Sequence, residues 1–269
     1  MRIAGALAAL LLLPAVLAGC GGGGVFTSSA LTADDVPEAA GVASGEPAKG
    51  ATKTAESGFN PFAAPPFTPE GGRVVIENPT LAEVMQTGSL PEMAFGRADA
   101  PVTIIKYASL TCPYCRRFHK EVFPKLKTEY IDTGKVRFII REFPIGKTSG
   151  AAMIALRCAK PEKYLDLYGK FLEQQPAWVS QEVRLDPIFK VASQVGMTRQ
   201  QFDACRENQA MIDGLKWVKD RGRTLGVIGT PNFFIGSTLV KKVLTIEEIR
   251  TMVEPLLKAR ATAAAGGSN

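Results

Sequence analysis

Three consecutive segments carry hydrophobic patterns that predict two buried strands joined by a helix. Residues 100–110 (APVTIIKYASL) form a nearly continuous apolar run rich in β-branched side chains, which is typical of a strand buried on both faces. Residues 135–144 (KVRFIIREFP) predict a second strand that ends at its proline. Between them, residues 111–134 carry apolar side chains at helical spacing up to an Asp-Thr-Gly turn: Cys115, Phe118, Val122 and Leu126. A strand, helix and strand of these lengths predict a right-handed βαβ unit.

The pattern changes after this unit. From about residue 148 to 226, apolar residues every three or four positions, punctuated by proline and glycine, predict a series of helices. Residues 227–243 then predict a loop, a strand, a Gly-Ser turn and another strand, and residues 245–259 predict an amphipathic helix capped by Thr245. The order βαβ, helices, ββα predicts an α/β protein with a thioredoxin fold and a helical domain inserted between its two halves.

The N-terminus has the pattern of an export signal. One early positive charge precedes an apolar run that is short for a transmembrane helix, and small residues follow it. The sequence LAGC, which ends at Cys20, resembles the lipobox of bacterial lipoproteins, in which the signal is cut before a cysteine that is then acylated. We therefore expect a signal peptide over 1–19 and lipid on Cys20. The alternative is an ordinary signal with an incidental cysteine.

The remaining segments complete the predicted domain organisation. Residues 20–72 are rich in Gly, Ala, Pro, Ser and Thr without an apolar period, which predicts a flexible linker between lipid and domain. Residues 73–100 are assigned to an N-terminal extension of the domain, and residues 101–269 to the domain itself, with a frayed end over ATAAAGGSN.

Composition and charge narrow the classes of function. With 46% hydrophobic and 22% charged residues, the 269-residue chain has the composition of a globular protein. The net charge of +6 comes from scattered lysines and arginines without a basic block or an aromatic-interleaved basic stripe. This distribution indicates solvated surfaces and no nucleic-acid partner.

The five cysteines have separate expected roles. If Cys20 carries lipid, four remain, and an exported chain favours disulfides over structural zinc. Cys112 and Cys115 can pair only locally, which leaves Cys158 with Cys205. That bond would close a loop of about 46 residues, worth on the order of 4 kcal/mol in the chain-entropy model. The alternative is two buried free thiols.

The sequence CPYC between the predicted strand and helix indicates redox chemistry. Pro113 suits the first position of a helix, which makes Cys112 the N-cap, and the free N–H groups of Tyr114 and Cys115 then point toward its sulfur. A helix N-terminus favours the thiolate form of a cysteine. Cys112 is therefore the expected nucleophile, and Cys115, one turn further along, the resolving thiol.

Four stretches together resemble the DsbA-like family of exported thiol:disulfide oxidoreductases, over about residues 101–257. They are SLTCPYCRRFH, VRFIIREFP, the helical insertion and GVIGTPNFFIG. The resemblance implies that Pro231 is the family's cis-proline beside the catalytic pair, that Thr230 and Tyr114 tune the redox potential, and that no cofactor is needed beyond the Cys112–Cys115 disulfide. The alternative for Pro231 is a trans turn proline.

Two residues near the motif raise separate questions. Six residues before Cys112, where many family members carry a buried acid, this chain has Lys106, which puts the family's proton relay in doubt. We expect its ammonium to lower the pKa of the Cys112 thiol, and the alternative is a lysine that reaches solvent. His119, the only histidine, could join Cys112 and Cys115 in an incomplete metal site. A polar residue on the exposed helix face is the favoured interpretation.

These features predict a lipid-anchored oxidase on the periplasmic side of the bacterial envelope that forms disulfides in other envelope proteins. A membrane partner would recycle it, either a DsbB-like quinone reductase or, for a reductase or isomerase, a DsbD-like reductant donor. A copper-delivery or other metal-binding module and a structural lipoprotein are the alternatives from other classes. Gly21, in place of the aspartate linked to inner-membrane retention, slightly favours the outer membrane.

Overall fold

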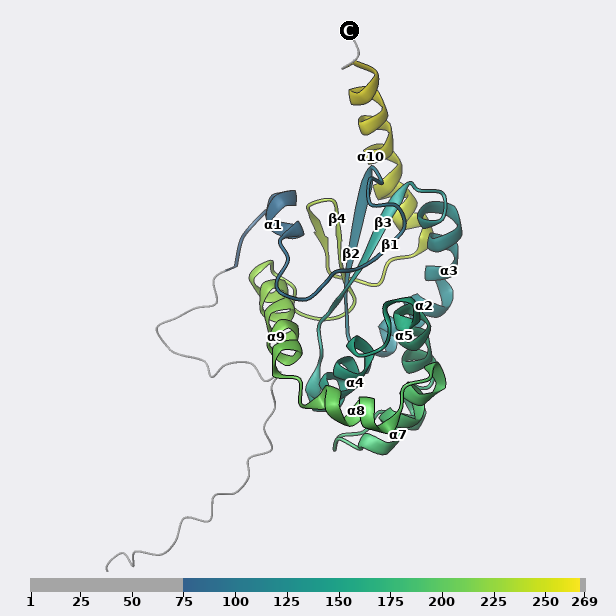
Figure 1. The fold of residues 1–269 in the computed structure, drawn as a ribbon. Helices are drawn as coiled ribbons and strands as arrows, with labels where there is room; N and C mark the ends of the chain where they lie inside the picture. Colours follow the sequence, from purple (N-terminus) through teal and green to yellow (C-terminus); the bar gives the residue numbers. More distant parts are fainter. Residues whose placement is uncertain (1–74, 267–269) are drawn as a thin grey trace, which may run out of the picture. The chain divides into compact units, whose positions relative to one another are not determined.

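The computed structural model describes residues 75–266, in which one mixed sheet of five strands has the order β1-β3-β2-β4-β5 (Figure 1). The central strands β2 and β3 are parallel, whereas β1 pairs antiparallel with β3, β4 with β2, and β5 with β4. This arrangement confirms the predicted thioredoxin fold. The strands are β1 Met93–Phe95, β2 Val102–Ala108, β3 Val136–Glu142, β4 Asn232–Ile235 and β5 Thr238–Val240.

Helices cover both faces of the sheet. On one face β2 contributes Ile104 to a core shared with α2, α3, α5 and α10, and on the other it contributes Ile105 and Tyr107 to a core near α1 and α9. In Figure 1, α1 and α9 lie on one side of the sheet and α2, α3 and α10 on the other. Within residues 75–266, the first helices are α1 Leu81–Met85, α2 Pro113–Glu121 and α3 Phe123–Leu126, and the last is α10 Ile246–Gly266.

The segment between β3 and β4 is helical, as the sequence predicts. Its helices are α4 Gly146–Arg157, α5 Tyr164–Glu173, α6 Gln175–Trp178, α7 Leu185–Ala192, α8 Arg199–Arg206 and α9 Gln209–Thr224, with short 3-10 turns at Pro161–Lys163 and Ser193–Val195.

A disulfide joins two of the inserted helices. Cys158 follows the last residue of α4 and Cys205 lies in α8, with their Cα atoms 6.2 Å apart. The Sδ atom of Met211 lies 3.8 Å from the sulfur of each. The bond therefore ties the C-terminal end of α4, whose N-terminal end lies beside the CPYC motif, to α8.

The helix after the CPYC motif is broken, which differs from the single element that its apolar spacing predicts. Helix α2 ends at Glu121, α3 follows it, and a π-helical turn over Lys127–Ile131 completes the segment. Pro124 explains the break, because it lacks an N–H donor and its ring crowds the carbonyl four residues earlier.

The C-terminal end of the described region differs from the expectation, whereas the N-terminal extension adds a helix and a strand to the domain. The expected frayed end is wrong as far as Gly266, because α10 continues to that residue through an alanine-rich segment that favours helix. The N-terminal extension contributes α1, whose N-cap Thr80 forms a capping box with Glu83, and the edge strand β1.

Several expectations fall outside the described residues. The signal peptide over 1–19, the lipid attachment at Cys20 and the linker over 20–72 belong to this group. Within residues 75–266, the structure contains no helix with the length and apolar character required to cross a bilayer.

Candidate active site

The CPYC motif lies at the junction of the connection after β2 with the first turn of α2. Cys112 is the N-cap of α2 with extended backbone angles (φ −78°, ψ 119°), and Pro113 occupies the first helical position. The backbone N–H of Cys112 donates to the Ser109 carbonyl at 3.2 Å, and the Cys112 carbonyl accepts from the Arg116 N–H at 3.2 Å. The sulfur of Cys112 is thereby held at the N-terminal end of α2.

The surroundings of Cys112 favour its thiolate. Hydrogen bonding from the Cys115 thiol lowers the pKa of Cys112 to about 5 against the opposing effect of burial, with further contributions from the Thr230 side chain and from the backbone N–H groups of Cys115 and Tyr114. Only 7% of the residue is exposed. A partly buried sulfur that is ionised at neutral pH is an effective nucleophile and a good leaving group.

Cys115 has the opposite character. It is fully buried, and burial, followed by its hydrogen bond to Cys112, raises the pKa of Cys115 well above its usual value, with the charge of Lys106 acting against this. Both cysteines carry free thiols in the structure. The pair thus combines an activated sulfur at Cys112 with a protonated, protected one at Cys115.

Lys106 lies inside the protein next to this pair. It occupies the same face of β2 as Ile104, because strand residues two apart share a face, and only 1% of it is exposed. Its Nζ donates to the Tyr168 hydroxyl at 3.1 Å and lies 4.4 Å from the centre of the Phe118 ring. The alternative of a lysine that reaches solvent is therefore wrong.

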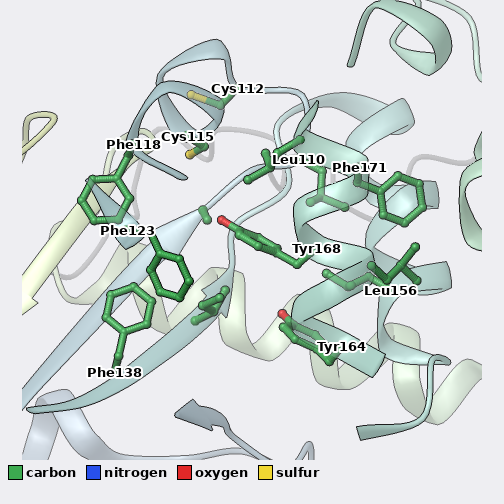
Figure 2. Packing of buried hydrophobic residues seen from close by; sticks show 14 of the residues in the cluster. Leu110, Cys112, Cys115, Phe118, Phe123, Phe138, Leu156, Tyr164, Tyr168 and Phe171 are labelled. Atoms are coloured by element: carbon green, nitrogen blue, oxygen red, sulfur yellow. The ribbon is translucent and has the colours of Figure 1, made fainter. Parts of the chain in front are cut away.

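Burial lowers the pKa of Lys106 to about 8, opposed by electrostatic attraction to Cys115 and, less strongly, to Cys112. At neutral pH the side chain is mainly an ammonium, and the Tyr168 hydroxyl, a cation–π contact and a nearby thiolate compensate for its desolvation. Figure 2 shows Tyr168 reaching from α5 with its hydroxyl directed toward Cys115. Lys106 therefore supplies the positive charge that the sequence predicts beside the pair. This charge interacts more strongly with the resolving sulfur of Cys115 than with the nucleophilic sulfur of Cys112.

His119 is half-buried, so its placement on an exposed helix face is wrong. Its ring stacks on Phe123 with centroids 5.3 Å apart and meets the Tyr168 ring edge-on at 5.5 Å. Gly169 of α5 makes this position possible, since a Cβ there would lie 2.9 Å from the His119 Nε2. Burial and then the charge of Lys106 lower the pKa of His119 to about 4. The imidazole is neutral at physiological pH.

The structure does not bring a metal site together at this position. Across the described part of the chain, His, Cys, Asp and Glu side chains form no group of three or more that could hold a metal ion. The copper-delivery alternative, which needs Cys112, Cys115, His119 and a further ligand, has no geometric support there.

The loop before β4 lies against the Cys112 sulfur. The Thr230–Pro231 peptide bond is cis, and the Cys112 thiol donates to the Thr230 carbonyl at 3.1 Å. The side-chain oxygen of Asn232 accepts from the Ile228 N–H at 3.4 Å and so holds the loop.

Several residues that hold the site carry no sequence signal of their own. The buried Ser109 hydroxyl bonds with the Ser149 hydroxyl at 2.8 Å and the Thr111 hydroxyl at 3.1 Å, which ties the motif to α4. Tyr168 is one apolar position of an amphipathic helix in the sequence, and only the fold shows that its hydroxyl meets Lys106. Asn232, which begins β4 after the cis-proline, is a similar case.

The geometry of the site as a whole is suited to thiol–disulfide exchange. An activated sulfur at a helix N-terminus, a buried thiol one turn later and a cis-proline loop within hydrogen-bonding distance are arranged to make and break one disulfide.

Comparison with known proteins agrees with this class. A family model described as thioredoxin matches residues 89–255, more than half of the chain. A Rickettsia conorii protein named as a protein-disulfide oxidoreductase is 28% identical over 189 residues, covering 68% of this chain and 67% of the relative. Disulfide bond formation protein D of Bacillus subtilis is 25% identical over 172 residues, covering 61% of this chain and 77% of the relative.

Solved structures share the fold. Alpha-DsbA1 of Wolbachia pipientis superimposes with a TM-score of 0.62 at 24% identity, covering 68% of this chain and 98% of that one. BdbD of Bacillus subtilis superimposes with a TM-score of 0.58 at 22% identity, covering 70% and 100%. The chain belongs to the thioredoxin family; it is similar in sequence to protein-disulfide oxidoreductases and in fold to DsbA-type structures.

Proposed function

We propose that this chain is an exported oxidase that passes the Cys112–Cys115 disulfide to thiols of other envelope proteins. The observation that supports the proposal is the difference in acidity between the two thiols: the pKa of Cys112 is lowered to about 5, whereas that of Cys115 is raised. Stabilising the Cys112 thiolate stabilises the reduced form, and a stable reduced form makes the disulfide a stronger oxidant.

The reaction proceeds in two displacements. A substrate thiolate attacks the Cys112 sulfur, the Cys112–Cys115 bond breaks, and its electron pair leaves on Cys115, which takes up a proton. A second substrate thiolate then attacks the substrate sulfur of the mixed disulfide, and the electron pair leaves on Cys112 as a thiolate. Two electrons pass from the substrate to the enzyme, and the substrate gains one disulfide.

Lys106 assists the first displacement. Its ammonium lies in the same buried space as Cys115, where a sulfur that receives an electron pair would otherwise be an isolated buried anion. The positive charge stabilises that leaving thiolate until it is protonated. In this chain Lys106 thus takes the place of the family's buried acid as the charged group beside the resolving cysteine.

The surface around Cys112 supports proteins as substrates. Three of the six large apolar side chains that are exposed within residues 75–266 lie in the motif or in segments bonded to it: Tyr114 (56% exposed), Ile145 (49%) and Ile228 (75%). Ile145 is linked to the motif through its carbonyl, which accepts from Thr111, and Ile228 lies in the cis-proline loop. Such side chains fit the apolar side chains that an unfolded polypeptide exposes.

The cellular setting is proposed from the N-terminal sequence. The signal over 1–19, lipid on Cys20 and a linker over 20–72 would place the domain on the periplasmic side of a membrane, the outer membrane by preference. A membrane-bound quinone reductase of the DsbB-like type would accept the electrons and restore the disulfide.

The equilibrium potential of Cys112–Cys115 against glutathione tests the direction of electron flow. We expect a value more oxidising than about −200 mV, above the cytosolic glutathione range. A potential near about −270 mV, typical of thioredoxin, would instead support a reductase or isomerase served by a DsbD-like donor. Cys158→Ala/Cys205→Ala protein is the matched control, because it leaves a single redox-active pair.

A further inference from the structure

A side chain of the helical insertion holds the backbone of the CPYC motif. Gln175, the first residue of α6, is 5% exposed, and its Nε2 donates to the Leu110 carbonyl at 2.7 Å and to the Cys112 carbonyl at 3.0 Å. Both amide hydrogens are used on carbonyls two residues apart. A side chain of similar length without an N–H group could not make either contact.

The carbonyls that Gln175 binds lie where regular structure gives the backbone least support. Strand β2 pairs with β3 only as far as Ala108, and α2 begins at Pro113, so Leu110 and Cys112 lie in the connection between them. The Cys112 carbonyl already accepts the first hydrogen bond of α2. A second donor fixes the plane of the peptide that links Cys112 to Pro113, and with it the direction of the Cys112 side chain.

Gln175 is itself held firmly. The Val179 N–H donates to the Gln175 carbonyl at 2.9 Å and closes the single turn of α6. Trp178 at the end of that turn is fully buried, and its indole N–H donates to the Phe171 carbonyl of α5 at 2.8 Å. The amide therefore projects from an anchored turn and is positioned before any substrate arrives.

We infer that Gln175 is a positioning residue for the exchange reaction: by clamping the Leu110 and Cys112 carbonyls, it keeps the Cys112 sulfur facing the N–H groups of α2. The helical insertion then has a direct role at the reactive sulfur. The inference rests on the proposed exchange chemistry at Cys112 but not on the direction of electron flow. It would hold equally for an oxidase and for a reductase.

The test compares Gln175→Met with Gln174→Met in the full-length reduced protein. Gln174 is the half-buried neighbour, and its side chain bonds to Gln194 and not to the motif, so its variant controls for a methionine in the same segment. Thiolate absorbance is titrated in each protein, and the redox potential and melting temperature are measured alongside. We expect Gln175→Met to raise the pKa of Cys112 by about one unit and to make the potential more reducing, with Gln174→Met equal to wild type.

The outcomes separate positioning from plain stabilisation. A lower melting temperature with an unchanged Cys112 pKa and potential would overturn the inference, because a purely structural amide predicts that result. If Gln175→Met does not fold, Gln175→Asn keeps the amide but draws it back by one methylene, and an unshifted Cys112 pKa in that variant would overturn the inference as well. A reducing wild-type potential would refute the oxidase assignment while leaving this comparison intact.

Discussion

The Cys115 thiol is the largest single contribution to the acidity of Cys112, and replacing it tests how the nucleophile is activated. Cys115→Ala removes the donor and leaves the backbone N–H groups of α2 in place. A hydrogen bond to a charged group contributes about 1.5–3 kcal/mol, and one pKa unit corresponds to about 1.4 kcal/mol. The pKa of Cys112 should therefore rise by about one to two units from its value of about 5.

Cys115→Ser is the matched control, because its hydroxyl can still donate to the Cys112 sulfur. We expect its Cys112 pKa to stay close to that of the wild type. Within residues 75–266, either variant leaves Cys112 as the only free thiol once the Cys158–Cys205 bond is formed. With Cys20 replaced by alanine, thiolate absorbance across pH therefore reports one group. Equal pKa values in the alanine and serine variants would refute the reasoning and assign the activation to the helix N-terminus alone.

Four further predictions follow from the same geometry. Cys112→Ser should abolish oxidation of a dithiol peptide while Cys115→Ser traps mixed disulfides, and the reverse pattern on a denaturing gel would exchange the two roles. Lys106→Met should raise the pKa of Cys112 and make the potential more reducing, whereas an unchanged or lower pKa by thiolate titration would remove the lysine from the activation. Peptide mass mapping should find a Cys158–Cys205 link that survives mild reduction of the catalytic pair; free thiols at both positions would contradict it. Folding lowers the Cys112 pKa from 9.0 to about 5, so protonation of this sulfur destabilises the folded reduced protein. The melting temperature of the reduced protein should therefore fall relative to that of the oxidised form as the pH decreases through this range. A relative rise in that melting temperature would refute the prediction.

The fold class and the place of the nucleophile were predictable because their signals are local. The apolar run that forms β2, the proline at the first position of α2 and the second apolar run that forms β3 lie within about 45 consecutive residues, and each acts through its own backbone preference. The N-cap position of Cys112 follows from that order alone. Pro124 is also a local signal, from which the break in the helix could have been predicted. The regular apolar spacing across the break favoured a single helix instead.

The roles of Lys106 and His119 needed the tertiary structure. The sequence shows a lysine inside an apolar strand. It does not show that the Tyr168 hydroxyl, 62 residues later in the chain, accepts a hydrogen bond from this lysine. His119 was expected, as a polar residue, on the exposed face of its helix, and Gly169 of α5 allows it to be half-buried. In both cases the environment is supplied by the inserted helices.

Gln175 is the clearest case of a residue whose role only the tertiary structure reveals. In the sequence it is one of two adjacent glutamines before a proline, and nothing local distinguishes the one that bonds to Gln194 from the one that reaches the Cys112 carbonyl 63 residues away. Backbone preferences and hydrophobic period determine which segments become strands and helices, and they position Cys112 at a helix N-terminus. Which side chains surround it is decided by how the insertion packs against α2, because contacts between distant residues depend on the geometry of the whole core and not on any pattern within one segment.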